Sequence, residues 1–190
     1  MRYTMGMMTR SFKCIVTAFA MVVGVSLPLA ADEARLDELL EQLKQADEAT
    51  FQWIEDRIFE EWSKSGSPAM DLLLQRGQDA LEAGEPAVAL EHLTALVDHA
   101  PDFAEAYNAR ANAYYTLGLI GPAIDDLRQA LVLNPRHFGA LLGFGFMLEE
   151  MGREDEALEV YRQVQAIHPM APEVGIAIDR LARKFEGQAL

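Results

Sequence analysis

The chain has 190 residues and is 51% hydrophobic, which is enough apolar material for one packed domain or a short array of repeats. Its formal net charge is −14, because 30 acidic residues outnumber 16 basic ones. Affinity for nucleic acid comes from lysine and arginine side chains that neutralise phosphates, so nucleic acid and anionic lipid are poor candidate partners and basic partners are favoured.

The first 31 residues have the layout of an export signal. Basic residues in the first 13 positions precede an apolar run over residues 14–27, and Ala30 and Ala31 offer a cleavage site. The run is shorter than the roughly 20 residues that cross a bilayer as a helix. We therefore expect a cleaved signal peptide over residues 1–31, with an uncleaved N-terminal membrane tether as the alternative. Cleavage would remove Cys14, the only cysteine, and leave a chain suited to an oxidising compartment such as a bacterial periplasm.

Residues 32–66 show two successive patterns with apolar residues at helical spacing, which predict an N-terminal helical hairpin. The second pattern carries three large aromatic residues, Trp53, Phe59 and Trp62. In one interpretation the hairpin covers the exposed end of a helical array. In the other, the three aromatic residues form a separate docking or dimerisation surface, through which the chain would self-associate.

The central part of the chain, residues 67–171, repeats with a period of 34 residues and without insertions. Glycine, alanine and proline recur at that spacing: Gly84, Gly118 and Gly152; Ala89, Ala123 and Ala157; Pro101, Pro135 and Pro169. Each glycine is expected to end a first helix, since glycine adopts a left-handed conformation at little cost. Each proline is expected to stop a second helix, since it disfavours helix in the preceding residue. The repeats are 70–103, 104–137 and 138–171.

Small residues are expected where the two helices of each repeat cross, at Gly77, Ala111 and Gly145. A short side chain at a crossing lets two helices approach at the closer end of their usual separation. This period and content resemble the tetratricopeptide repeat (TPR) family over about residues 70–171. Two departures from the family pattern are Arg76 and Arg110, where leucine is typical.

The resemblance implies an all-α fold, a right-handed α–α superhelix or TPR solenoid, whose concave groove is lined by the first helix of each repeat. By resemblance, the groove residues are Leu74, Gln78, Asn108, Asn112, Tyr115, Leu142 and Phe146. Asparagine amides can donate to and accept from a peptide backbone, and the aromatic rings supply apolar area. This mixture suits a peptide or an amphipathic helix of a protein partner better than a charged ligand.

Some TPR co-chaperones grip acidic chaperone tails with a clamp of lysine, arginine and asparagine. The corresponding residues here are Leu74, Gln78, Ala109, Gly139 and Gly143, so the clamp is absent. After the repeats, residues 172–190 predict a C-terminal capping helix and tail. The polar side of that helix carries Arg180, Arg183 and Lys184, for which a small basic contact site is the alternative interpretation.

No motif of the sequence indicates catalysis, phosphate binding or a metal site. The four histidines are His92, His99, His137 and His168, and we expect them to be solvated turn residues. His99 and His168 lie two repeats apart, so they should not converge on a metal ion. We expect no catalytic residue and no cofactor.

The sequence therefore predicts a non-catalytic interaction scaffold or adaptor of the bacterial periplasm, with envelope assembly as one process that would use it. Two alternatives remain. One is a membrane-tethered structural protein that oligomerises through the N-terminal hairpin. The other is an accessory subunit of an envelope enzyme complex.

Overall fold

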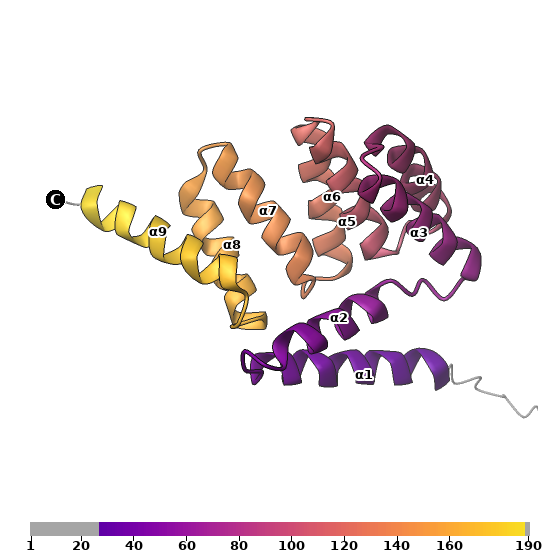
Figure 1. The fold of residues 1–190 in the computed structure, drawn as a ribbon, viewed down its shortest axis with the longest axis horizontal. Helices are drawn as coiled ribbons and strands as arrows, with labels where there is room; N and C mark the ends of the chain where they lie inside the picture. The colour runs from indigo at the N-terminus through magenta and orange to yellow at the C-terminus, as the bar shows by residue number, and fades with distance from the viewer. Residues whose placement is uncertain (1–26, 189–190) are drawn as a thin grey trace, which may run out of the picture.

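The computed structural model describes residues 27–188, and in this range the chain forms helices only (Figure 1). The helices are α1 (Leu27–Lys44), α2 (Phe51–Trp62), α3 (Pro68–Glu82), α4 (Pro86–His99), α5 (Ala104–Thr116), α6 (Ile120–Leu133), α7 (Phe138–Glu150), α8 (Glu154–Ile167) and α9 (Pro172–Gln188). Helices α3 to α8 pair within the three predicted repeats and stack side by side, so the predicted all-α solenoid is confirmed.

The predicted export signal lies mostly outside the described residues, which begin at Leu27 with the first residue of α1. Between that residue and the end of α9, no helix combines the length and the apolar character that a bilayer crossing requires.

A glycine ends the first helix of each repeat, as the sequence predicts. Gly84, Gly118 and Gly152 have φ angles of 74°, 73° and 74°, in the left-handed region that a side chain makes costly. At the end of α3, the Gly84 N–H donates to the Leu81 carbonyl at 3.0 Å and the next N–H donates to the Ala80 carbonyl at 2.8 Å. This pair of bonds is a Schellman motif, and the same pair follows α5 and α7. Each tight turn sends the second helix back along the first.

Small residues bring the helices of a repeat close together at two crossings that leave no room for a Cβ atom. A Cβ on Gly77 would lie 2.5 Å from the Leu93 side chain, and one on Gly145 would lie 2.7 Å from the Tyr161 ring. These distances confirm that the helices of the first and third repeats depend on glycine at the position where they cross.

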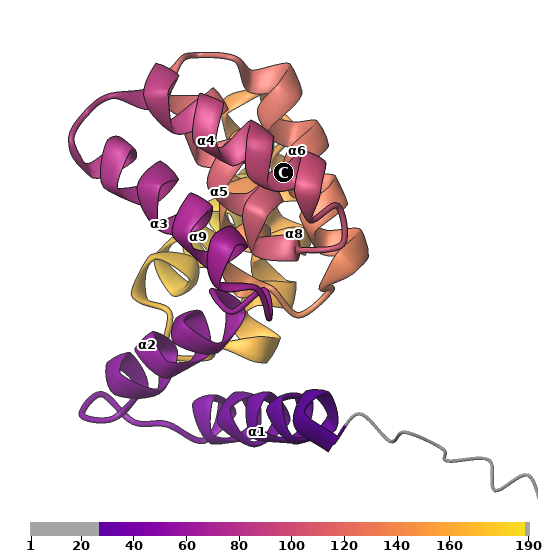
Figure 2. The same cartoon turned by 90° about the vertical axis from the view of Figure 1, so that its right-hand side faces the viewer.

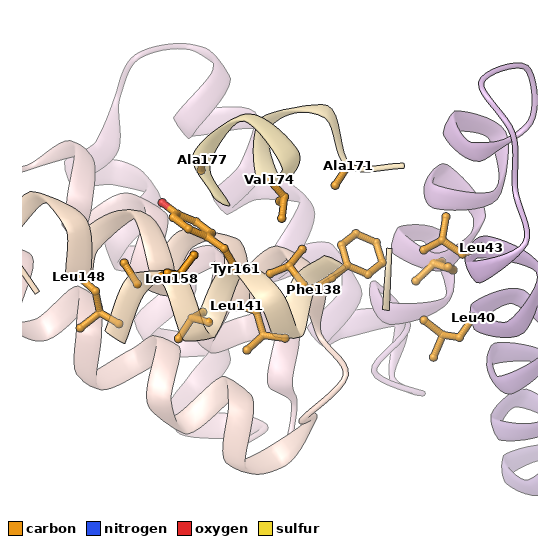
Figure 3. Packing of buried hydrophobic residues seen from close by; sticks show 14 of the residues in the cluster. Leu40, Leu43, Phe138, Leu141, Leu148, Leu158, Tyr161, Ala171, Val174 and Ala177 are labelled. Carbon is orange, nitrogen blue, oxygen red and sulfur yellow. The ribbon is translucent and has the colours of Figure 1, made fainter. Parts of the chain in front are cut away.

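The N-terminal hairpin and the third repeat share one hydrophobic core. Leu40 and Leu43 of α1 are buried in the same cluster as Phe138 and Leu141 of α7 and residues of α8 and α9 (Figure 3). The core therefore joins segments that are about 100 residues apart in the sequence, and it ties the two ends of the described chain together.

The prediction that the hairpin covers the exposed end of the solenoid is wrong. Helices α1 and α2 lie along one edge of the solenoid, beneath the loops that join one repeat to the next (Figures 1 and 2). Trp62 stacks on His137 in the loop before α7, and Phe51 contacts His168 in the loop before α9. An ion pair of 2.6 Å between Arg136 and Asp37 adds a polar contact to the same edge. The hairpin lies here because these loops present apolar and aromatic surface that must be covered.

We expect Gly145→Ala to destabilise the protein by about 1–3 kcal/mol, because the new methyl group would overlap the Tyr161 ring. The matched control is Gly175→Ala in α9, where a Cβ atom would meet nothing within 4 Å. In a helix this control should be neutral or stabilise by up to about 1 kcal/mol. Urea unfolding measures both changes, and equal stabilities of the two variants would contradict the close crossing.

Candidate functional site: a groove between α5, α7 and α9

Four of the seven residues predicted to line a groove do lie together. Asn112 and Tyr115 of α5 and Leu142 and Phe146 of α7 line one hollow of about 550 Å³, whose other side is formed by residues of α8 and α9. Phe146 is 47% exposed, so a large aromatic ring faces solvent inside this hollow. An exposed apolar ring in a concave site is a typical anchor for a ligand.

Tyr115 and Phe146 form an aromatic pair that shapes one side of the groove. Their ring centroids lie 5.8 Å apart at 79°, an edge-to-face arrangement. The Tyr115 hydroxyl donates to Glu150 Oε1 at 3.1 Å. Partial removal from water, together with this carboxylate, raises the pKa of Tyr115, so its hydroxyl stays protonated. The phenol is thus held in place by Glu150 while its ring supports Phe146.

Two glycines of α7, Gly139 and Gly143, line the bottom of the groove one helical turn apart. A Cβ on Gly143 would lie 3.6 Å from the Leu127 side chain of α6, so α7 packs against the second repeat at this glycine. A Cβ on Gly139 would lie 3.3 Å from the Phe59 ring of α2, so the hairpin packs directly against this part of α7.

Helix α9 forms one side of the groove and is held there by an ion pair between Arg180 and Glu149. Arg180 donates from both terminal nitrogens to Glu149 of α7, with Nη2 at 2.9 Å from Oε2. The Tyr161 hydroxyl of α8 donates to the same carboxylate at 3.2 Å. The hydrogen bonds from Arg180 lower the pKa of Glu149, and burial, reinforced by Glu149, raises the pKa of Tyr161. One carboxylate therefore connects α7, α8 and α9.

The basic residues of α9 do not form a free contact site. Arg180 is paired as described, and Lys184 lies 2.5 Å from Glu154 at the start of α8. The Arg183 side chain donates to the carbonyl of Asp179 within its own helix at 2.9 Å. These contacts fit a helix that covers the third repeat. Val174 and Leu181 of α9 are buried in the shared core.

The other three predicted groove residues lie elsewhere. Leu74 is 1% exposed and packs in the core of the first repeat. Asn108 is 8% exposed, and its amide donates to Glu105 at 3.2 Å. Gln78 is half-buried on α3 and does not line the groove. The prediction is wrong for Leu74 and Asn108, because the tight packing of α3 and α5 turns their positions inward.

The three aromatic residues of the hairpin do not form a common docking surface either. Trp53 is 61% exposed, whereas Trp62 is 7% exposed. Phe59 packs against Phe138 with ring centroids 5.2 Å apart, and Trp62 stacks on His137 at 4.1 Å and 20°. Phe59 and Trp62 are thus used to hold the hairpin on the solenoid, and the expectation of a joint dimerisation surface is wrong.

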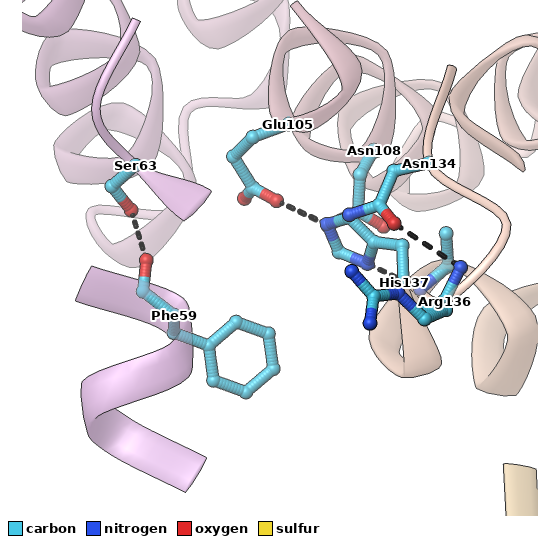
Figure 4. A network of polar contacts seen from close by, with 8 residues as sticks. Phe59, Ser63, Glu105, Asn108, Asn134, Arg136 and His137 are labelled. Carbon is cyan, nitrogen blue, oxygen red and sulfur yellow. Dashed lines mark hydrogen bonds and ion pairs between the residues drawn. The ribbon is translucent and has the colours of Figure 1, made fainter. Parts of the chain in front are cut away.

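The prediction of solvated histidines is wrong at two positions. His137 is fully buried, and its Nδ1 accepts from the Ala140 N–H at 3.1 Å. Its Nε2 therefore carries the proton and donates to Glu105 Oε2 at 2.8 Å (Figure 4). His168 is 2% exposed and lies between Phe51 and Phe138. Both histidines are buried by residues of α2. Their burial could not be predicted, because the sequence does not indicate where the hairpin packs.

Comparison with known proteins agrees with this architecture. The family model of the tetratricopeptide repeat matches residues 74–125 and 122–172. The chain belongs to the tetratricopeptide repeat family. A TPR repeat-containing protein of Rhizobium etli is 31% identical over 159 residues, which cover 83% of this chain and 78% of the relative.

Two solved structures are similar in fold to this TPR protein. The Sgt2 TPR domain of Aspergillus fumigatus has a TM-score of 0.59 and 23% identity, over 65% of this chain and 83% of that one. The first TPR of Spaghetti (RPAP3), bound to the HSP90 peptide SRMEEVD, has a TM-score of 0.59 and 21% identity, over 62% of this chain and 95% of that one.

One departure from the TPR pattern has a structural explanation. Arg110 of α5 is paired with Asp126 of α6 by two hydrogen bonds of 2.7 Å, and Asp126 is 7% exposed. The Tyr107 and Tyr114 rings lie 5.7 Å from the guanidinium on either side. A partly buried, bidentate pair thus stands inside the second repeat at a position where leucine is typical.

The pH dependence of the stability of Glu149→Gln tests the ion pair between Glu149 and Arg180 that holds α9 on the third repeat. Because the pKa of Glu149 is lowered in the folded state, its contribution to stability is present above the ordinary glutamate pKa of 4.5 and is lost as the pH falls through the folded value. We expect the wild type to be more stable than Glu149→Gln at pH 7, and the difference to shrink below about pH 4.5. Thermal unfolding of both proteins across this pH range measures the difference in stability. A difference that does not depend on pH would contradict the ion pair between Glu149 and Arg180.

Proposed function

We propose that this TPR protein is a non-catalytic scaffold that binds a peptide or helical segment of a protein partner in the groove between α5, α7 and α9. The observation that carries the proposal is the 47% exposed Phe146 ring, which lines a hollow of about 550 Å³. A TPR domain of similar fold is bound to a peptide, which supports a peptide as the kind of ligand.

The chemistry of the groove favours a peptide over a small charged ligand. Its apolar surface comes from Leu142, Phe146 and the ring of Tyr115, and the exposed Asn112 supplies an amide that can both donate and accept. A segment with one or two apolar side chains and a free backbone edge matches both features.

We also propose that the protein acts in a bacterial periplasm, as the layout of its first 31 residues suggests. N-terminal sequencing of the protein purified from its native cells tests this proposal. A mature chain that begins at Ala31 or Asp32 in the periplasmic fraction supports it. A full-length chain in the membrane fraction would support the tethered form, and a full-length soluble chain in the cytoplasm would contradict both.

Site-specific photocrosslinking tests the groove itself. A photoreactive phenylalanine analogue would replace Phe146 in the full-length chain, and in a control it would replace Val132, a 74% exposed apolar residue of α6 outside the groove. We expect covalent adducts with a protein partner from position 146 and none from position 132. Equal adducts from both positions would contradict a groove-specific partner.

We expect Phe146→Ala combined with Asn112→Ala to weaken partner binding by more than about tenfold, as the loss of an aromatic anchor does. Because both side chains are exposed, the midpoint of thermal unfolding should stay nearly unchanged. The control is Val132→Ala. Equal loss of binding and stability in the double variant would show that these residues serve the fold and not recognition.

A further inference from the structure

The groove continues into a second hollow that the N-terminal hairpin completes. This hollow has a volume of about 220 Å³ and lies between α2 and the junction of α8 with α9. Leu142 and Glu173 line both it and the main groove, so the two are contiguous. Helix α2 contributes Phe51, Gln52 and Glu55. Because these residues lie outside the repeats, the hollow depends on where this chain places its hairpin.

The polar groups of this hollow can accept hydrogen bonds from a cation. Glu55 of α2 and Glu173 of α9 both line it with carboxylates. His168, which is 2% exposed, lines the same hollow. Its Nε2 faces Glu55 at 3.8 Å, and its Nδ1 has no hydrogen-bond partner among the described residues. With the ring proton on Nε2, towards Glu55, Nδ1 is a buried acceptor without a partner among the described residues.

The walls of the hollow suit a long aliphatic chain with a charged end. The rings of Phe51 and Phe138 flank His168, with centroid distances of 5.7 Å and 5.3 Å to its imidazole. Lysine and arginine bury their methylene stems against apolar surface and keep the charged group at its edge. The aromatic faces also attract a cation.

Other occupants fit less well. Within residues 27–188, no group of three histidine, cysteine or acidic side chains is placed to hold a metal ion. An acidic segment such as SRMEEVD, the peptide bound to the structurally similar TPR domain, would meet two carboxylates and a protein with a net charge of −14. An uncharged apolar side chain would cover the Glu55 and Glu173 carboxylates without pairing them.

We infer that the hollow is a subsite for a lysine or arginine side chain of the partner, and that the groove reads an apolar residue and a basic residue together. This inference rests on the proposed function, since the apolar residue is the one that binds at Phe146. The two subsites share Leu142 and Glu173, so both residues of the partner lie in one short segment. Glu55 and Glu173 pair with the basic side chain at the mouth of the hollow, beside the buried His168 ring.

A displayed library of random peptides, selected on the full-length protein, tests the inference without knowledge of the natural partner. We expect the wild type to enrich peptides with an aromatic or aliphatic residue at a fixed spacing from a lysine or arginine. Glu55→Gln with Glu173→Gln should keep the apolar preference and lose the basic one. Phe146→Ala should lose the apolar preference.

A synthetic copy of the most enriched peptide then measures the coupling between its basic residue and the two glutamates. Replacing its basic residue by norleucine should reduce affinity about tenfold for the wild type and less than about twofold for the Glu55/Glu173 double variant. The charge-matched control is Asp125→Asn with Glu41→Gln, whose side chains are 77% and 63% exposed and lie outside both hollows. It should show the tenfold effect of the wild type.

The outcomes separate this inference from the proposed function. Enrichment of apolar peptides without a basic residue, or with an acidic one, would overturn the basic subsite and leave the groove intact. A basic preference that survives in the double variant would also overturn it. Enrichment that ignores Phe146, or no enrichment at all, would contradict the proposed function itself.

Discussion

The contact between Trp62 and His137 determines where the N-terminal hairpin lies. The imidazole is held rigidly, because its two nitrogens bond to the Ala140 N–H and to the buried Glu105 carboxylate. Its flat face is therefore fixed for the indole, which stacks on it at 4.1 Å. Since Glu105 comes from the second repeat and Ala140 from the third, the stack on this imidazole joins α2 to two repeats at once. A helix docked in this way covers the loops along the edge and leaves the concave face open.

Helices outside the repeats border the groove and the hollow beside it. Repeats alone would leave these borders open. Helix α9 is held on the third repeat through Glu149, and helix α2 packs against the same repeat through Phe51 and Phe59. Helix α9 thus borders the groove, and α2 borders the smaller hollow that adjoins it. The repeats supply the apolar anchor at Phe146, and the added helices supply the carboxylates of Glu55 and Glu173. Under the proposed function, selectivity for a partner comes from the flanking helices more than from the TPR framework.

The sequence predicts the repeats well because their determinants are local. A glycine with a positive φ angle ends a helix wherever it stands, and a glycine such as Gly145 at a crossing is required by a neighbour only 16 residues away, Tyr161. Part of the groove is also predictable: the helical spacing from Asn112 to Tyr115 and from Leu142 to Phe146 places each pair on one face. The burial of Leu74 and Asn108 was missed, because it depends on how closely α3 and α5 pack against their neighbours, and not on repeat register.

The position of the hairpin could not be predicted, because it depends on contacts such as Trp62 with His137 that span 75 residues and follow no repeat. The measurement that tests it most directly is hydrogen–deuterium exchange of Trp62→Ala beside Trp53→Ala, two substitutions of the same residue type on α2. With Trp62→Ala we predict that amides of α2 and of the first turn of α7 exchange at least about tenfold faster, while α3 and α4 are unchanged. Trp53→Ala, at a 61% exposed side chain, should exchange like the wild type. Unchanged exchange of α2 in Trp62→Ala, or equal effects of both substitutions, would contradict the docking of the hairpin and its part in the binding site.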